Sequence, residues 1–306
     1  MPSRSALLWL THVWAPELQA EFDKFHTMRN PEPPDVWLLM DARTNGAEEI
    51  VQRYRRHHIF DERTLFTLPY PKLAGHGLIN HPHFPILDFY LSHQDYDTYW
   101  VIEYDVRYTG PWESLFNTFR CFDHDLVTSH IRRFAQEPHW FWWDTLHHPT
   151  KSIAREDYLR SFNVVYRISN RALEFVHQAQ LEGWQGYPEV SLPTLLFKGG
   201  FKLLDFGGKG EFALPEFGNR FYTSHGMRSG NLCLFGTMRY RPSRAMAGTK
   251  KNMLYHPVKP ESMREPLQVK LRIIARWVLD LIHDIVSARK YRTPDPPDFN
   301  RRPIYK

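Results

Sequence analysis

Cysteine is scarce in this chain, because only Cys121 and Cys233 occur among its 306 residues. Two cysteines cannot form the multiple disulfides on which small secreted domains depend, and they lack the paired spacing of a structural zinc site. The low cysteine content fits a reducing compartment, in which thiols stay unpaired. It excludes a disulfide-stabilised fold and a zinc-finger type of protein.

Long hydrophobic runs are also missing. The apolar run near the N-terminus extends only from Ala6 to Leu10 before Thr11 and His12 follow. This run is too short for the core of a signal peptide and far shorter than the ~20 apolar residues of a membrane-spanning helix. We therefore expect a cytoplasmic protein, with the inner face of the membrane as the alternative location.

A tract in which cations alternate with aromatic rings is the third absence. Lysine and arginine total 39 against 34 acidic residues, which gives a net charge of +5 without such a tract. A channel for single-stranded nucleic acid combines positive charge with stacking rings. We therefore expect no nucleic-acid partner, and the excess of cations in the last third of the chain suggests an anionic ligand or surface.

The order of apolar segments predicts an α/β fold. Ala6 to Trp14 is typical of a strand, Pro16 opens a helix, and Val36 to Met40 is a continuous apolar run typical of a buried strand. A strand, a helix and a second buried strand predict a mainly parallel sheet flanked by helices. We expect one large domain over residues 1–262 and a C-terminal appendage over 263–306.

The appendage is expected to contain a long amphipathic helix from Leu267 to Arg289. Packing on the large domain is the expected role of its apolar stripe. Contact with an anionic membrane surface is the alternative, because Lys270, Arg272 and Arg276 make the helix basic. The stripe consists of Leu267, Leu271, Ile274, Val278, Leu281 and Ile285.

The stretch YWVIEYDVRYTGPW, from Tyr99 to Trp112, holds the most informative pattern. Its apolar start predicts a buried strand, and Glu103 and Asp105 follow at the end of that strand. Residues two apart on a strand point to one face, and ligands of open α/β sheets bind beyond the carboxyl ends of strands. The two carboxylates can therefore bind one hard divalent cation. Solvated acids, one paired with Arg107, are the alternative, which the spacing alone favours.

Two further polar features suit a phosphorylated ligand. Asp41 follows the second strand and can accept hydrogen bonds from a ribose or a base, although capping the next turn is an equally good interpretation. The basic loop from Met238 to Lys259 contains Lys250 and Lys251, and such cations suit a diphosphate. An exposed charged loop is the alternative.

Aromatic residues are plentiful, at 15% of the chain with 10 tryptophans. The densest aromatic run lies between Pro138 and Asp144. A buried cluster is the default interpretation of this run. A wall that stacks on sugar rings is the alternative, because tryptophan and tyrosine present flat apolar faces with polar edges.

Taken together, several stretches resemble the nucleotide-sugar glycosyltransferases of the GT-A fold, a Rossmann-like mixed sheet. The segment EYDVRYTG, from Glu103 to Gly110, closely resembles a signature of an uncharacterised glycosyltransferase-like family best populated in fungi. The segment from Tyr166 to Leu196 is similar in layout to branching N-acetylglucosaminyltransferases and peptide xylosyltransferases. The βαβ opening to Asp41 and the late Tyr255 to Lys259 complete the resemblance.

The resemblance implies transfer of a sugar from a nucleotide-diphosphate donor, with a UDP-sugar favoured, to a hydroxyl of a glycan or glycolipid. It implies Glu189 as the base of an inverting reaction, and Mn²⁺ or Mg²⁺ as the cation. Some branching enzymes use basic side chains in place of the metal, so both arrangements stay open. The implied metal ligands are Glu103, Asp105 and His256; the donor contacts are Thr11, Asp41, Arg107, Lys250, Lys251 and Lys259; and the acceptor contacts are Trp112, Trp142 and Trp143.

Three alternatives stay open at this point. The first is a carbohydrate-binding protein without catalytic activity on the same fold, since fold alone does not determine function. The second is a retaining glycosyltransferase. The third is a metal-dependent phosphohydrolase, which is disfavoured because the further acids and histidines of a two-metal site are missing.

Overall fold

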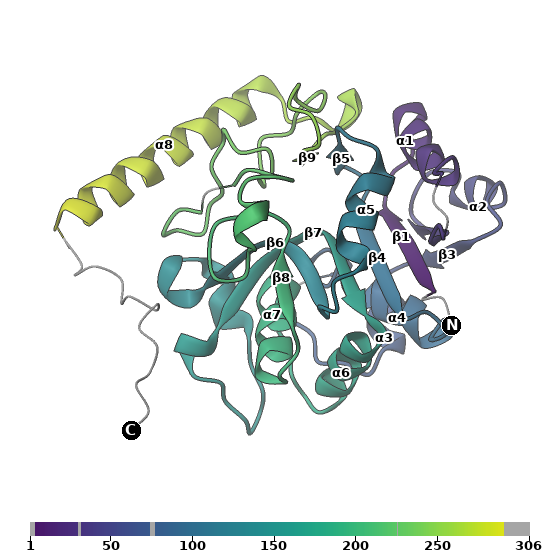
Figure 1. The fold of residues 1–306 in the computed structure, drawn as a ribbon, viewed down its shortest axis with the longest axis horizontal. Coiled ribbons are helices and arrows are strands. Elements are labelled where there is room, and N and C mark those ends of the chain that lie inside the picture. The colour runs from purple at the N-terminus through teal and green to yellow at the C-terminus, as the bar shows by residue number, and fades with distance from the viewer. Residues whose placement is uncertain (1–3, 30–31, 74–76, 225, 291–306) are drawn as a thin grey trace.

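The computed structural model describes residues 4–29, 32–73, 77–224 and 226–290 (Figure 1). Its centre is a seven-stranded sheet of order β3-β2-β1-β4-β7-β6-β8. β7 runs antiparallel to its neighbours β4 and β6, and all other neighbouring strands in this sheet are parallel. The predicted mixed, mainly parallel α/β fold is therefore confirmed. The strands are β1 (Ser5–Thr11), β2 (Asp35–Asp41), β3 (His57–Phe60), β4 (Thr98–Glu103), β6 (Leu126–Arg133), β7 (Leu159–Ser169) and β8 (Leu203–Asp205).

Helices cover both faces of this sheet. The α-helices are α1 (Pro16–His26), α2 (Ala47–Val51), α3 (Thr64–Thr67), α4 (Phe84–Ser92), α5 (Trp112–Arg120), α6 (Asn170–Leu181), α7 (Pro188–Lys198) and α8 (Leu267–Lys290). Short 3-10 helices cover Leu78–Asn80, Phe134–Gln136, Phe141–Thr145, Arg155–Asp157, Pro215–Phe217 and Glu261–Met263.

Alternation along the central strands divides the core into two layers. Leu7 and Trp9 of β1 pack with the apolar residues of α1 and α5, whereas Leu8 packs with those of α4 and α6. This division follows from the period of two along a strand, which sends neighbouring side chains to opposite faces. Because both faces are covered, β1 is a continuous apolar run, as buried parallel strands are.

A small second sheet brings distant parts of the chain together at the end of β4. β5 (Arg107–Tyr108) pairs antiparallel with β9 (Leu254–Tyr255). Beyond this pairing, the backbone N–H of Val258 donates a hydrogen bond to the carbonyl oxygen of Asp105, at 2.8 Å. The late basic loop therefore returns to the carboxyl end of the central strand.

The C-terminal helix forms where the sequence predicts it, but its predicted packing is wrong. The stripe expected to cover the large domain faces outward, and Leu267 is 71% and Leu271 56% exposed. α8 instead contacts the body through a different face, described below. The division at residue 262 stays a prediction, and residues 291–306 lie outside the described part of the chain.

No helix among the described residues has both the length and the apolar character needed to cross a membrane.

The start of α6 shows how local chemistry fixes an element of the fold. The hydroxyl of Ser169 accepts a hydrogen bond from the backbone N–H of Ala172 at 3.2 Å, which satisfies a helix-start amide that has no partner within the helix. The same hydroxyl donates to the carboxylate of Asp125 at 2.8 Å. This cap joins β7 to α6, which leads on to the acid at the start of α7.

We expect Ser169→Ala to lower the free energy of unfolding by about 1 kcal/mol, the usual cost of losing such a cap. Urea denaturation measures the change. Ser152→Ala is the matched control, because Ser152 is exposed and caps no helix. Equal stability of the two variants would contradict a stabilising role for the cap.

Candidate functional site

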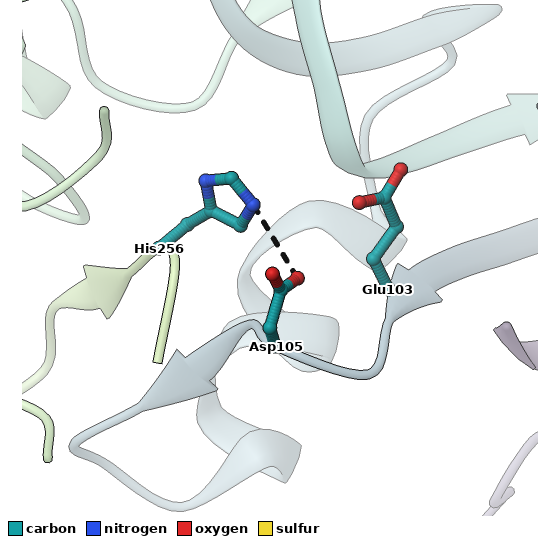
Figure 2. Close-up of side chains that lie close together, drawn as sticks. All are labelled: Glu103, Asp105 and His256. Atoms are coloured by element: carbon teal, nitrogen blue, oxygen red, sulfur yellow. Dashed lines mark ion pairs between the residues drawn. The ribbon is translucent and has the colours of Figure 1, made fainter. Parts of the chain in front are cut away.

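Three side chains that can bind a metal converge at the carboxyl end of β4. Glu103 is the last residue of β4, Asp105 follows two residues later, and His256 comes directly after β9 (Figure 2). One ligand atom from each of the three lies within 4.8 Å of the others. Asp105 and His256 are buried and Glu103 is half-buried. Pairing of β5 with β9 explains this meeting of residues 150 positions apart in the chain.

The orientation of His256 is set by its second ring nitrogen. Nδ1 of His256 lies 2.7 Å from the carbonyl oxygen of Arg239, and because a carbonyl only accepts, Nδ1 carries the proton. Nε2 then faces Oδ1 of Asp105 at 3.3 Å. Histidines that bind metals commonly donate their other N–H to a carbonyl in this manner, which fixes the ring and its tautomer.

The residues present fit a divalent cation. Oδ1 of Asp105 is buried, and no hydrogen bond from the described residues reaches it. Ligand atoms on opposite sides of a Mg²⁺-sized ion lie about 4.2 Å apart, so the 4.8 Å spread closes with small side-chain rotations. Two carboxylate oxygens and one imidazole suit Mn²⁺ or Mg²⁺ better than a soft metal that prefers thiolates.

The electrostatics of the cluster favour a positive charge at its centre. Burial and the neighbouring Asp105 raise the pKa of Glu103 to about 8. Burial would also raise the pKa of Asp105, but His256 and Lys259 outweigh it and lower that pKa. Two carboxylates so close together repel each other, and a bound cation removes this repulsion.

Lys259 is the only one of the three predicted phosphate-binding lysines that reaches the cluster. Its Nζ lies 3.5 Å from Oδ2 of Asp105. Lys250 and Lys251 are exposed and lie beyond Thr109, whose hydroxyl donates to the carbonyl of Lys250. Three residues separate Thr109 from Asp105 in the chain. No ion pair joins Lys250 or Lys251 to the cluster among the described residues, and their contact with the diphosphate stays a prediction.

Arg107 has a structural role besides the predicted one. Its guanidinium donates to the carbonyl oxygens of Tyr104 and Val106 at 2.6 and 2.8 Å, and lies 3.5 Å from the carboxylate of Glu21. Burial lowers its pKa, although Glu21 and Asp105 oppose this. Arg107 thus stabilises the turn after β4, and it also lines a cavity of about 290 Å³ together with Lys259, so its contact with the donor stays a prediction.

Thr11 and Asp41, the predicted donor contacts at the ends of β1 and β2, use their polar atoms within the fold instead. Thr11 is buried, and its hydroxyl donates to the carbonyl of Val13 at 2.5 Å, which shapes the turn after β1. The carboxylate of Asp41 is buried and accepts from the backbone N–H and the side chain of Arg43. The alternative interpretation of Asp41, as a residue that stabilises the following turn, is the one observed.

A cavity beside these strand ends was missed by sequence reasoning. It has a volume of about 320 Å³, and its lining includes His12, Trp14, Arg43, Asn45 and Pro260. Partial burial lowers the pKa of His12, whereas the charges of Asp105 and Asp41 oppose this, so the cavity adjoins the acid cluster. The signal in the sequence was weak, because a lone histidine after a strand is common.

Glu189 lies on the other side of the cluster, at the start of α7. It is buried, and its Oε2 accepts a hydrogen bond from the hydroxyl of Tyr240 at 2.8 Å. Burial raises its pKa to about 7, although Arg160 and Tyr240 oppose the shift. The charge of Glu189 in turn contributes to the raised pKa of Glu103, so the two carboxyl groups lie near each other.

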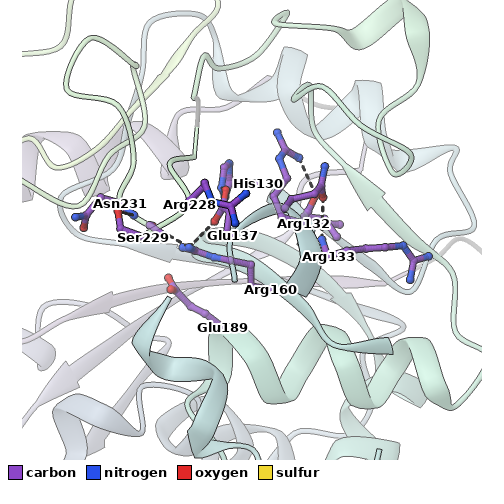
Figure 3. A network of polar contacts seen from close by, with 12 residues as sticks. His130, Arg132, Arg133, Glu137, Arg160, Glu189, Arg228, Ser229 and Asn231 are labelled. Atoms are coloured by element: carbon purple, nitrogen blue, oxygen red, sulfur yellow. Dashed lines mark hydrogen bonds and ion pairs between the residues drawn. The ribbon is translucent and has the colours of Figure 1, made fainter. Parts of the chain in front are cut away.

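A buried ion-pair network holds the partners of Glu189 (Figure 3). Arg160 is fully buried; it pairs with Glu137 at 2.7 Å and donates to Tyr240 and to the carbonyl of Gly230. Its guanidinium also stacks on the ring of Trp140 at 3.9 Å. Gly230 has a φ of +81°, and a Cβ there would lie 2.1 Å from Trp140, so only glycine fits. These residues were not identified from the sequence, because their partners are 23 to 80 positions apart.

The aromatic candidates divide between core and surface. Trp112 and Trp143 are 3% and 1% exposed, so neither can stack on a sugar, and their predicted role as acceptor contacts is wrong. Trp142 is half-buried and stacks on Tyr187, with ring centroids 4.0 Å apart. Tyr187 directly precedes α7, so Trp142 lies beside the helix that carries Glu189 and stays a candidate acceptor contact.

Comparison with known proteins gives a partial family match and a distant structural likeness. Residues 40–125 match a family described as "Protein of unknown function (DUF3405)", and this range contains Glu103, Asp105 and the EYDVRYTG segment. No curated protein matches the chain. Among solved structures, the apo form of mouse xyloside xylosyltransferase 1 is similar with 10% identity and a TM-score of 0.37, over 66% of this chain and 85% of that chain. A likeness this distant does not bear on the chemistry of the site.

We expect the isolated protein to bind Mn²⁺, and Asp105→Asn to weaken this binding. Removing a residue that only supports a metal ligand typically costs about 10- to 100-fold in affinity, and loss of a ligand itself should cost more. The reason is that the substitution removes a charged ligand atom from the centre of the cluster. Isothermal titration with MnCl₂ measures the affinity, and Glu156→Gln is the control, because it removes an exposed acid elsewhere. Equal affinities for the two variants would exclude the cluster as the metal site.

Proposed function

We propose that this protein is a glycosyltransferase that moves a sugar from a nucleoside diphosphate to a hydroxyl group of a glycan or glycolipid. One observation carries the proposal: Glu103, Asp105 and His256 meet, Lys259 contacts Asp105, and the charge of Glu189 acts on Glu103. Such a site offers a cation-binding centre for a diphosphate, and a carboxylate near neutral pKa for an acceptor. These are the two groups that sugar transfer from a nucleotide requires.

The nucleoside has a suitable place in the cavity lined by His12, Trp14 and Arg43. Its volume of about 320 Å³ lies at the lower end of the range for small-molecule sites, about 300 to 1,000 Å³. Pro260, which lines this cavity, is adjacent to Lys259, and Lys259 contacts Asp105. A nucleoside in the cavity would therefore direct its phosphates toward the acid cluster. We favour a UDP-sugar as the donor.

Stabilisation of the leaving diphosphate is assigned to Lys259 and the acid cluster. Glu103, Asp105 and His256 would hold Mn²⁺ or Mg²⁺, and the cation would neutralise the charge that develops on the phosphates. The ammonium of Lys259 supplies a second positive charge, 3.5 Å from Asp105. Lys259 is half-buried, so its attraction to the phosphates would be stronger than in water, because the effective dielectric constant is lower.

Activation of the acceptor is assigned to Glu189. A sugar hydroxyl is a poor nucleophile, so a base must accept its proton as the new glycosidic bond forms. A pKa of about 7 suits this task, because the group is partly ionised at neutral pH and still binds a proton well. Tyr240 orients the carboxylate through Oε2, and Arg160 orients Tyr240. A single base without a covalent intermediate gives inversion, and the anomeric configuration of the product distinguishes this from a retaining reaction.

We expect UDP to bind more tightly with Mn²⁺ than without it, because a cation held by Glu103, Asp105 and His256 would neutralise the charge of the diphosphate. Isothermal titration of UDP against the wild-type protein, with and without Mn²⁺, measures this difference. Lys259→Gln should weaken UDP binding more than Lys251→Gln does, because Lys259 contacts Asp105, whereas Lys251 is exposed and pairs with no acid of the cluster in the described part of the chain. Absence of binding to any nucleoside diphosphate would overturn the proposed function.

We expect Glu189→Gln to reduce sugar transfer by about 10²- to 10⁴-fold, the usual contribution of a general base. Release of UDP from a UDP-sugar in the presence of acceptor sugars measures turnover. Glu182→Gln, which changes an exposed acid at the end of α6, is the control. For the wild-type protein, kcat/KM should decrease as the pH is lowered through about 7, because protonated Glu189 cannot accept a proton. A bound cation should shift this decrease to lower pH. Unchanged turnover in Glu189→Gln would exclude this base.

A further inference from the structure

The C-terminal helix α8 is held to the body along one of its faces. The carboxylate of Asp284 accepts a hydrogen bond from the backbone N–H of Arg228 at 2.8 Å, and that of Asp280 accepts from the side chain of Asn231 at 2.5 Å. Trp277 packs edge-on against Phe235, with ring centroids 5.7 Å apart. In Figure 1, α8 runs along the edge of the molecule, with the loops that follow β8 between it and the sheet.

The opposite face of α8 is apolar and exposed. With 100° between successive residues, the side chains that contact the body lie in one sector, and most of the exposed aliphatic side chains lie in the sector on the other side. This outer face of α8 consists of Leu267 (71% exposed), Leu271 (56%), Val278 (40%), Leu279 (66%), Ile282 (52%), Ile285 (48%) and Val286 (58%), with Ile274 (39%) at its edge. So large a contiguous apolar surface is rare on a soluble monomer and indicates an interaction site.

The charges around the outer face have a single sign. Lys270 flanks it on one side and Arg272 on the other, whereas Arg276 lies toward the body, where it lines a cavity with Tyr240 and Arg241. Within the part of the chain that the structure describes, none of these three cations has an ion-pair partner. The two acids of α8, Asp280 and Asp284, are both engaged with the body on the inner face. The outer half of the helix is therefore positively charged without compensation.

We propose that the outer face of α8 binds the surface of an anionic lipid bilayer, with its aliphatic side chains in the acyl boundary and its cations among the headgroups. An apolar face bordered by lysine and arginine is the arrangement by which helices lie in the membrane interface. Phe235, which is 84% exposed beside Trp277, adds an aromatic ring next to the helix. The inference does not depend on the activity proposed above.

The same charges disfavour a second copy of the chain as the occupant. Antiparallel packing of two α8 helices through their outer faces would place these cations over the apolar second half of the partner helix, and parallel packing would bring the cations of one copy against those of the other. No acid on the outer half of the described helix could neutralise that repulsion. Phosphates of anionic lipids supply the negative charge that the surface lacks, and each lysine or arginine near such a surface contributes about a fivefold gain in binding.

Co-sedimentation of the full chain with vesicles tests the proposal. We expect binding to vesicles of phosphatidylcholine with 30% phosphatidylglycerol, little binding to vesicles of phosphatidylcholine alone, and weaker binding as salt increases. The variant Arg272→Gln should bind the anionic vesicles about fivefold more weakly. Leu271→Gln/Val278→Gln should also weaken binding, although it leaves the net charge unchanged.

A control variant and a measurement of folding accompany the vesicle experiment. Phe66→Gln is the matched apolar control, because Phe66 is 79% exposed on α3, and it should bind vesicles like the wild-type protein. All substituted positions are exposed, and circular dichroism will show whether the fold is kept. Absence of binding to anionic vesicles, or binding that the α8 variants leave unchanged, would overturn the proposal. A dimer in light scattering that Leu271→Gln/Val278→Gln dissociates would overturn it too, by making a second copy the occupant.

Discussion

The buried carboxylate of Asp105 is the constraint on which the site depends. A carboxylate removed from water needs positive charge or hydrogen bonds nearby, since an isolated buried charge is very costly. His256 and Lys259 meet this need, as an imidazole and an ammonium, while the backbone N–H of Val258 binds the main-chain carbonyl of the same residue. One short segment thus surrounds the end of β4, and Oδ1 of Asp105, which faces His256 without a hydrogen bond, is available to a cation. The chain folds back across 150 residues to satisfy one charge.

A second buried charge organises the other half of the site. Arg160 connects Glu137, Tyr240 and the carbonyl of Gly230, and through Tyr240 it reaches Glu189. Removing one partner from such a network leaves a buried charge without compensation, which typically costs about 3 to 5 kcal/mol. The geometry around Glu189 is therefore rigid. The loop that supplies Gly230 also binds α8 through its neighbour Asn231, so the helix and the carboxylate are anchored to the same loop.

Much of the fold could be predicted from the sequence, because local patterns carry it. The apolar runs that form β1, β2 and β4 are continuous, as expected for strands covered on both faces. The proximity of Glu103 and Asp105 could be predicted because these residues lie two positions apart at the end of one strand. The meeting with His256 depended on a resemblance to a known family, because nothing local connects the two segments.

The remaining parts of the site required tertiary contacts. Thr11, Asp41 and Arg107 have the residue types of ligand contacts, yet each is occupied by a neighbour in the fold. Residue type gives the chemistry that a side chain can perform, but only packing determines whether its polar atoms are still available. The same reasoning applies to Trp112 and Trp143, whose rings fill the core instead of facing a sugar.

By itself, the sequence determined the mainly parallel α/β sheet, the acids at the end of its central strand and the amphipathic character of the last helix. Those features arise from periodicity and from residues close together in the chain. Only the tertiary structure decided that His256 and Lys259 join Asp105, that Glu189 lies beside Tyr240, and that the apolar stripe of α8 faces outward. The physical reason is that burial, pairing of charges and exposure of a helix face depend on neighbours distant in sequence, which no local pattern specifies.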